Sequence, residues 1–347
     1  MAGIAFHTGA VMTDLADEPL KIFCQQHGVS PPFSMERIRA GRNSEVHRIS
    51  NPHGQWILKN YYQHSSDKRD RLGTEFGFLT YLQNAGTTVV ARALGMESAL
   101  HCALYSYLSG ARPVAITPAH ISQAVRFIKT INLSRSAPDA LALPTAADAC
   151  LSWQAHMELA ASRIDRLLAV QPKQEVETEA NKFVSEQLLP LWLSLKASLL
   201  QVLGPLQTRY LLPMEDRIIS PSDFGFHNVL ENQGELFFLD FEYAGWDDPV
   251  KLICDFICQP ELPVTQSQGQ QFRDEMLSDL PHSDEIKNRV ELLLPVHRLK
   301  WCCILLNEFR LEDRNRRLHA GVGSDGLLAD QLGKAKWYFN AHLAASH

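Results

Sequence analysis

Three side chains with oxygen donors fall within one short stretch of the chain, and their types and spacing predict a cation site. Asp223 precedes Asn228 by five residues, and Asp240 follows after another twelve. Carboxylate and carboxamide oxygens are hard ligands, and no soft ligand accompanies them. Such a set suits Mg²⁺, which takes one or two carboxylates and leaves its remaining positions to water and phosphate oxygens.

A β-hairpin is the element that must bring these side chains together. Two apolar runs within residues 217–243 flank an Asn-Gln-Gly turn at 232–234, as they do in a hairpin. If the turn centres near Gly234, position 240 faces Asn228 across the ladder, because paired positions in a tight hairpin keep a constant sum. We therefore expect Asn228 and Asp240 to be neighbours.

This stretch resembles the aminoglycoside-phosphotransferase and choline-kinase-like family, whose members are relatives of the eukaryotic protein kinases. The family signature is a catalytic loop of the form His-Gly-Asp-x-x-x-x-Asn, followed by a hairpin and an Asp-x-Glu/Asp segment. Here Pro-Ser-Asp-Phe-Gly-Phe-His-Asn occupies 221–228, and Asp-Phe-Glu-Tyr-Ala-Gly-Trp-Asp-Asp-Pro occupies 240–249. The resemblance implies that Asp223 is the catalytic base and that Asn228 and Asp240 hold Mg²⁺.

The catalytic loop departs from the family pattern at its first two positions. Pro221 stands where the family has histidine, and Ser222 stands where it has glycine. A proline fixes φ, but it cannot supply the hydrogen bonds of an imidazole. No group on the direct transfer path is missing. Asp255, on a helix predicted after Pro249, is expected to be a buried anchor for the loop, and His227 is expected to pack against the loop or shape it.

The resemblance also implies a nucleotide site in the N-terminal part of the chain. A kinase of this type needs a strand lysine to hold the α and β phosphates and a helical carboxylate to hold that lysine. Lys59 ends a predicted strand, and Glu75 lies 16 residues later on a predicted helix. The phosphate-covering loop is expected at 40–46 and the adenine-binding segment at 103–108. The ATP contacts predicted in these two segments are Gly41, Asn43, Ser44, Tyr105 and Tyr107.

The acceptor pocket has fewer signals. Glu242 is predicted either to join the surroundings of the metal or to be a structural acceptor. Trp301 and Glu308 lie on a helix predicted over 284–313, which resembles the helices that line the family's acceptor pocket; simple packing on the lobe is an equal alternative. The tryptophans at 153, 192, 246 and 301 would stack on a sugar, cage a quaternary ammonium, or be core.

The segment pattern predicts an α+β, bilobal protein-kinase-like fold. Residues 1–109 form the expected β-rich nucleotide-binding lobe, with strands at 46–49, 55–59, 89–90 and 102–108 and a helix at 69–84. Residues 110–347 form the expected helical lobe with the catalytic loop, metal site and acceptor pocket, and 110–113 is the predicted hinge. The helices expected in this lobe are 118–133, 146–169, 175–202, 249–258, 265–278, 284–313 and 326–343.

Composition excludes several classes of protein. The chain has 347 residues, 45% of them hydrophobic, and a net charge of −6, which gives no electrostatic footprint for nucleic acid or an anionic membrane. The seven cysteines form no Cys-x-x-Cys pair and are expected to be reduced core residues. The N-terminus lacks a secretory pattern and no apolar run is long enough for a membrane helix, so the expected compartment is the cytoplasm.

Together these features predict an ATP- and Mg²⁺-dependent kinase that phosphorylates a hydroxyl of a small metabolite, with a sugar or amino sugar as the preferred acceptor. Choline, ethanolamine or aminoglycoside phosphorylation is an alternative. From a different class, a nucleotide-binding pseudokinase scaffold also remains open. A protein acceptor is disfavoured because no Ala-Pro-Glu stretch follows Asp240. The oligomeric state is not indicated.

Overall fold

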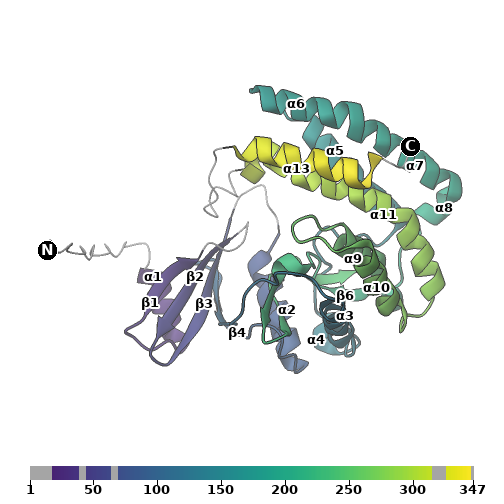
Figure 1. The fold of residues 1–347 in the computed structure, drawn as a ribbon. Helices are drawn as coiled ribbons and strands as arrows, with labels where there is room; N and C mark the ends of the chain where they lie inside the picture. Colours follow the sequence, from purple (N-terminus) through teal and green to yellow (C-terminus); the bar gives the residue numbers. More distant parts are fainter. Residues whose placement is uncertain (1–17, 39–43, 64–68, 315–325, 345–347) are drawn as a thin grey trace.

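A small lobe built on a β-sheet lies beside a larger helical lobe (Figure 1). The computed structural model describes residues 18–38, 44–63, 69–314 and 326–344. The sheet and the helix α1 come from the N-terminal part of the chain, and most of the helices come after residue 113. This confirms the α+β, two-lobed architecture that the sequence predicts.

The N-terminal sheet is antiparallel throughout, in the order β1-β2-β3-β5-β4. Its strands are β1 (Ser34–Ile38), β2 (Ser44–Asn51), β3 (Gly54–Tyr61), β4 (Ala93–Glu97) and β5 (Cys102–Ser106). The strand expected at 89–90 is wrong: Val90 forms only an isolated bridge, to Phe238. Its neighbour Val89 accepts a hydrogen bond from the Phe238 amide at 2.9 Å, so this segment pairs with the other lobe instead of the sheet.

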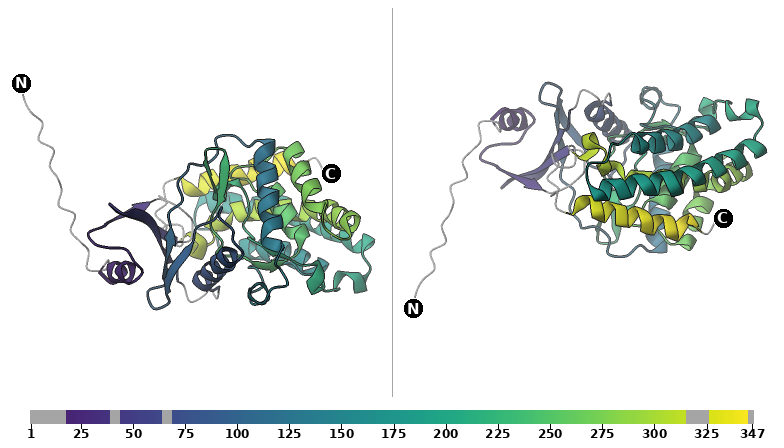
Figure 2. Two further views of the ribbon diagram at one scale, coloured as in Figure 1. Left: turned by 90° about the horizontal axis from the view of Figure 1, so that it is seen from below. Right: turned by 90° about the horizontal axis from the view of Figure 1, so that it is seen from above.

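Helices cover the N-terminal sheet. The helix α1 (Glu18–Gln26) packs Leu20 and Phe23 against Leu58 and Leu104 of the sheet, on the side away from the helical lobe (Figure 2). The helix α2 (Arg71–Asn84) begins after Asp70, whose carboxylate accepts a hydrogen bond from the Gly73 amide at 2.8 Å. Such a cap satisfies a backbone donor that the first turn leaves free. This element carries the predicted Glu75.

The second lobe is mainly helical, and α11 packs against α5, α9 and α13. Its helices are α3 (Pro118–Asn132), α4 (Pro138–Leu141), α5 (Trp153–Leu168), α6 (Glu175–Phe183), the π-helical turn η2 (Val184–Leu188), α7 (Leu189–Val202), α8 (Pro205–Thr208), η3 (Met214–Asp216), η4 (Phe226–Asn228), α9 (Pro249–Cys258), α10 (Gln266–Leu277), α11 (Ser283–Leu305), η5 (Asn307–Phe309) and α13 (Leu327–His342). The helix predicted at 249–258 is confirmed to the residue.

Two predicted helices are too long. The helix expected from residue 146 begins only at Trp153, because Asp148 has a φ of +56° and Ser152 caps the first turn by accepting a hydrogen bond from the Ala155 amide. The helix expected over 284–313 ends at Leu305 and is followed by the short turn η5. In both cases the residues beyond the shortened helix include residues that line the cleft, such as Asp148 and Glu308.

Two small sheets flank the segment that the sequence predicts to be catalytic. The strand β6 (Ile218–Ser220) pairs with β9 (Gly245–Asp247), and β7 (Val229–Asn232) pairs with β8 (Glu235–Phe238). The hairpin between β7 and β8 is confirmed, but its predicted register is off by one residue. Gln233 and Gly234 have φ values of +52° and +82°, as in a two-residue type I′ turn.

The shorter turn changes which residues face each other. Asn228 is opposite Leu239 instead of Asp240, and the Leu239 amide donates to the Asn228 carbonyl at 3.0 Å. Asp240 adopts a φ of +66°, an uncommon conformation for a residue other than glycine. The strand pairing therefore ends at Leu239, and Asp240 begins a different backbone path.

The hinge segment is fixed to the same hairpin. Ala111 and Glu231 exchange two backbone hydrogen bonds, at 3.1 and 2.7 Å. Gly110 has a φ of +153°, and a Cβ at this position would lie 2.8 Å from the Glu231 carbonyl oxygen. Only glycine suits both constraints, so residue 110 permits the close approach of the hinge segment to β7.

All seven cysteines are buried and free, as predicted. Among the described helices, none combines the length and the apolar character that crossing a membrane requires.

Candidate active site

A cleft of about 1020 Å³ contains residues from both lobes. Every predicted site residue that the structure describes lines this cleft. These residues are Ser44, Lys59, Glu75, Tyr105, Tyr107, Asp223, Asn228, Asp240, Glu242, Trp301 and Glu308. The predicted contacts Gly41 and Asn43 lie outside the described residues.

Lys59 joins the two lobes. Its ammonium donates to Glu75 Oε2 at 2.6 Å and to Asp240 Oδ1 at 2.7 Å. Burial disfavours the charged form of Lys59, but Asp240, Glu75 and Glu242 outweigh this effect and raise its pKa well above the usual value. Lys59 is therefore a fixed cation at neutral pH. The predicted pair between Lys59 and Glu75 is present in the structure.

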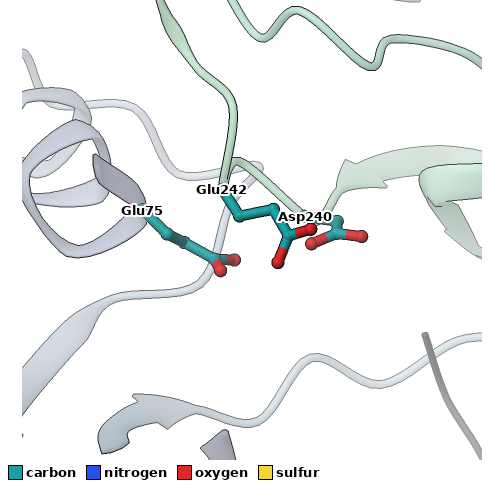
Figure 3. Close-up of side chains that lie close together, drawn as sticks. All are labelled: Glu75, Asp240 and Glu242. Carbon is teal, nitrogen blue, oxygen red and sulfur yellow. The ribbon is translucent and has the colours of Figure 1, made fainter. Parts of the chain in front are cut away.

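Three carboxylates surround this lysine. Glu75 from α2 and Asp240 and Glu242 from the segment after β8 point toward one another (Figure 3), and an oxygen of each lies within 4.8 Å of the others. Burial, and next the charge of Asp240, raises the pKa of Glu242 to about 7, against the opposing effects of Lys59 and Arg71. The Arg71 Nε lies 3.6 Å from Glu242 Oε1. Hard oxygen donors with excess negative charge fit a divalent cation such as Mg²⁺.

The hydroxyl groups of two tyrosines form a hydrogen-bonded chain that ends at Glu75. The Tyr61 hydroxyl donates to Glu75 Oε2 at 2.7 Å and lies 2.7 Å from the Tyr105 hydroxyl. Tyr61 lies two residues after Lys59 in β3, so both side chains lie on the same face of the strand. The Phe241 amide also donates to Glu75 Oε1, at 3.4 Å. Glu75 is thus held by groups from β3 and from the segment after β8, and Tyr105 of β5 acts on it only through Tyr61.

The catalytic loop runs between β6 and β7 and is anchored by aromatic side chains. Phe224 and Phe226 are buried and contact Phe256 of α9, with ring centroids 5.8 and 5.5 Å apart. Between the two anchoring rings and β6, the Asp223 side chain stays 35% exposed to the cleft. The Asn228 side-chain amide donates to the Asp223 carbonyl at 3.1 Å. The loop is therefore fixed at its base while its carboxylate remains accessible.

The far end of the cleft, formed by α5, α11 and η5, has a balanced set of charges. Arg163 pairs with Asp148 at 2.6 Å, and Arg310 pairs with Asp313 at 2.5 Å. Trp301 donates its indole N–H to Asp255 Oδ1 at 3.0 Å.

Comparison with known families decides the classification of the chain. The model of the phosphotransferase enzyme family, named APH, matches residues 34–275, which include both the sheet with Lys59 and the hairpin with Asp240. The chain belongs to this family. It is therefore a small-molecule phosphotransferase, as the catalytic-loop pattern predicts. A search of curated protein sequences found no match.

Solved structures confirm that this APH-family chain has the kinase-like fold of the family. A choline/ethanolamine kinase family protein from Mesorhizobium loti has a TM-score of 0.56 at 14% identity, over 93% of this chain and 94% of that one. Choline kinase LicA from Streptococcus pneumoniae has a TM-score of 0.55 at 14% identity, over 93% and 99%. Spectinomycin phosphotransferase in complex with ADP and spectinomycin has a TM-score of 0.58 at 11% identity, over 91% and 98%.

On the acceptor side of this family member, one prediction needs correction and one open alternative is decided for three tryptophans. Glu308 does not lie on the long helix; it is buried on η5, after α11 has ended. Of the four tryptophans considered, only Trp301 lines the cleft, and the others lie in the core. The sequence could not distinguish these cases, because the apolar periodicity continues across the break at Leu306.

Two residues of the APH-family site were missed by sequence reasoning. His227 was expected only to shape the loop, yet its Nε2 lies 3.2 Å from Asp223 Oδ1. Tyr61 was not considered, although it bonds Glu75. Two spacings could have indicated these residues: His227 lies four residues after Asp223, and Tyr61 lies two residues after Lys59, the last residue of the predicted strand. Asp255 is confirmed as a buried residue, 4% exposed, and it accepts hydrogen bonds from His297 and Trp301.

Proposed function

We propose that the chain transfers the γ-phosphoryl group of ATP to a hydroxyl of a small metabolite in an Mg²⁺-dependent reaction. The observation that carries the proposal is the cleft that combines Lys59 and Glu75 from one lobe with Asp223 and Asp240 from the other. Phosphoryl transfer requires mainly alignment and neutralisation of charge, and these four residues supply a cation, its holder, a base and a metal ligand.

Each residue has a defined role in this proposal. Lys59, held by Glu75, binds the α and β phosphate oxygens. Asn228 and Asp240 hold Mg²⁺, which neutralises charge on the phosphates when it is bound. Asp223 orients the acceptor hydroxyl and accepts its proton. Similar proteins support the choice of nucleotide, since the spectinomycin phosphotransferase was solved with ADP.

The phosphate end of the cleft has a further polar group. Ser44 is 1% exposed and lines the cleft, and its hydroxyl has no hydrogen-bond partner within the described ranges. Buried hydroxyls are normally satisfied. A phosphate oxygen would supply the missing partner, as the sequence prediction for this residue requires.

We infer that the acceptor is a polyhydroxylated molecule, a sugar or amino sugar, in preference to a polycation. The arginines at the far end, Arg163 and Arg310, are each paired with an aspartate, so this end lacks the excess of acid that a polycation would need. Paired arginine and carboxylate groups can donate to and accept from sugar hydroxyls. A choline-type cage of several tryptophans is not formed, since only Trp301 of the four reaches the cleft.

The test is ATP consumption with Mg²⁺ across sugars, amino sugars, aminoglycosides, choline and ethanolamine. In the wild type we expect turnover with at least one sugar. Asp223→Ala should lower kcat by about 100-fold or more, the usual contribution of a general base, while the KM for ATP stays within about twofold. Glu235→Ala, at an exposed acid of the same hairpin outside the cleft, is the control and should retain wild-type kinetics.

Two results would contradict the proposal. Nucleotide binding without turnover on any acceptor would favour the pseudokinase scaffold. Near-normal turnover by Asp223→Ala would remove the base from the mechanism.

A further inference from the structure

Lys251 is a buried cation that the family pattern does not require. It lies on the first turn of α9, is 2% exposed, and borders the same cleft as Asp223. Its ammonium lies 2.9 Å from Asp247 Oδ2 and 3.5 Å from Asp255 Oδ2. Burial disfavours the charged ammonium, but Asp247 and Asp255 outweigh this and raise the pKa of Lys251 above its usual value. A permanent charge is therefore fixed directly behind the catalytic loop.

The third contact of Lys251 is with the loop itself. The ammonium donates to the Ser222 hydroxyl at 3.3 Å, and that hydroxyl donates to the Ala147 carbonyl at 3.3 Å. Ser222 is the residue before Asp223 and has a φ of +68°. A left-handed conformation is unfavourable for serine, and the hydrogen bonds of its side chain offset that cost.

These contacts occupy the place where the chain departs from its family. The signature has histidine and glycine before the catalytic aspartate, and here Pro221 and Ser222 stand instead. Glycine would adopt the φ of residue 222 without strain, but it would have no hydroxyl for Lys251 to bind. Serine at this position therefore adds a contact at the cost of backbone strain.

We propose that Lys251 is a positioning residue that holds the catalytic loop through the Ser222 hydroxyl, in place of the family histidine. This inference rests on the proposed role of Asp223 as the base. Lys251 does not touch the reacting groups; it acts by fixing the backbone from which the Asp223 carboxylate extends.

The two carboxylates beside Lys251, those of Asp247 and Asp255, have further hydrogen-bond partners. Asp255 Oδ1 accepts from Lys300, from the Trp301 indole at 3.0 Å and from His297 Nδ1 at 3.0 Å. Asp247 Oδ1 accepts from the backbone amides of Cys150 and Asp248, at 3.1 and 2.8 Å. Both carboxylates that hold Lys251 are thus bound by groups outside the loop, so these groups fix the position of the Lys251 ammonium.

A purely structural role makes a different prediction. If Lys251 served only to neutralise two buried acids, the Ser222 hydroxyl would be dispensable. Replacement by glycine would then relieve backbone strain, raise stability and leave turnover unchanged.

The decisive variants are therefore at residue 222. Ser222→Ala removes the hydroxyl and keeps the Cβ, while Ser222→Gly removes both and tolerates the left-handed backbone. We expect kcat to fall about tenfold in both, consistent with the loss of one hydrogen bond to a charged group, with the KM for ATP within about twofold. We expect the melting temperature to rise or stay constant for Ser222→Gly. Wild-type kcat in both variants would overturn the inference.

Variants at residue 251 test the coupling. Lys251→Arg keeps the charge and should retain more activity than Lys251→Met. The effects on kcat of Lys251→Met and Ser222→Gly should not add in the double variant, because both break the same contact; full additivity of the two effects would overturn the inference. If Lys251→Met does not fold, the two variants at residue 222 decide the question alone.

Arg289 supplies a matched control. It is a buried cation, 8% exposed, paired with Asp248 in the same network, and it lies outside the cleft lining. Arg289→Met should lower stability and leave kcat of the folded protein unchanged. If Arg289→Met lowered kcat as much as Lys251→Met does, the effect of Lys251 on kcat would be a general consequence of lost stability. Wild-type protein without turnover would refute the proposed function, whereas active wild type with fully active Ser222 variants would refute only the positioning role.

Discussion

Replacing Tyr61 by phenylalanine tests whether Glu75 must be held in place for nucleotide use. The change removes one hydroxyl that donates to Glu75 Oε2 at 2.7 Å and leaves the pair between Glu75 and Lys59 intact. A hydrogen bond to a charged group contributes about 1.5–3 kcal/mol. Because about 1.4 kcal/mol corresponds to a factor of ten, we expect kcat/KM for ATP to fall at least about tenfold.

The control is a second buried tyrosine with a single acceptor. The Tyr81 hydroxyl donates to the Ile131 carbonyl at 2.6 Å, and this tyrosine is 3% exposed. Tyr81→Phe should cost about 1 kcal/mol of unfolding free energy and leave the kinetics unchanged. Urea unfolding and steady-state kinetics at varied ATP measure both quantities. If Tyr61→Phe matched Tyr81→Phe in stability and retained wild-type kcat/KM, the support of Glu75 by Tyr61 would have no functional role.

Two further predictions concern stability. Burial lowers the pKa of His297 to about 3, so the unfolded chain binds a proton there that the folded chain does not, and stability falls as the pH drops below about 6.5; the cost should reach about 2 kcal/mol by pH 5. Urea unfolding at pH 7.5 and 5 should show that His297→Gln loses about that much less than the wild type, and an equal loss would contradict the assignment. Gly110→Ala should destabilise the protein by about 1–3 kcal/mol more than Gly86→Ala, which shares a positive φ but meets no atom within 4 Å; equal losses in thermal unfolding would show that the approach to Glu231 is not constrained.

Local patterns in the sequence were sufficient for much of the fold and the site. The spacing between Lys59 and Glu75 led to a real ion pair, because the strand and the next helix carry both residues to one face. The apolar runs around residues 232–234 led to a real hairpin, and the boundaries of α9 followed from Pro249 and its periodicity. These features depend on neighbours in sequence, where propensity and pattern are informative.

The errors arose where backbone conformation or tertiary contact decides. Gln233 takes a left-handed conformation that sequence pattern alone does not indicate for glutamine, so the turn was placed one residue too far and Asp240 was expected opposite Asn228. Apolar periodicity extends beyond the true helix in two places: before the start of α5, at the loop with Asp148, and past the end of α11, at the turn with Glu308. The role of Lys251 could not be predicted, because its partner Ser222 is 29 residues away in sequence and the contact exists only in the folded chain.

The charge around Lys59 explains why three acids are retained in a buried site. The acids Glu75, Asp240 and Glu242 lie beside the cations Lys59 and Arg71, and all of these groups except Asp240 are largely removed from water. Isolated buried charges are expensive, and burial, followed by the charge of Asp240, raises the pKa of Glu242 to about 7. A divalent cation would favour the ionised form of Glu242. Among the described residues, the cluster of Glu75, Asp240 and Glu242 would therefore favour the binding of a divalent cation beside Asp240.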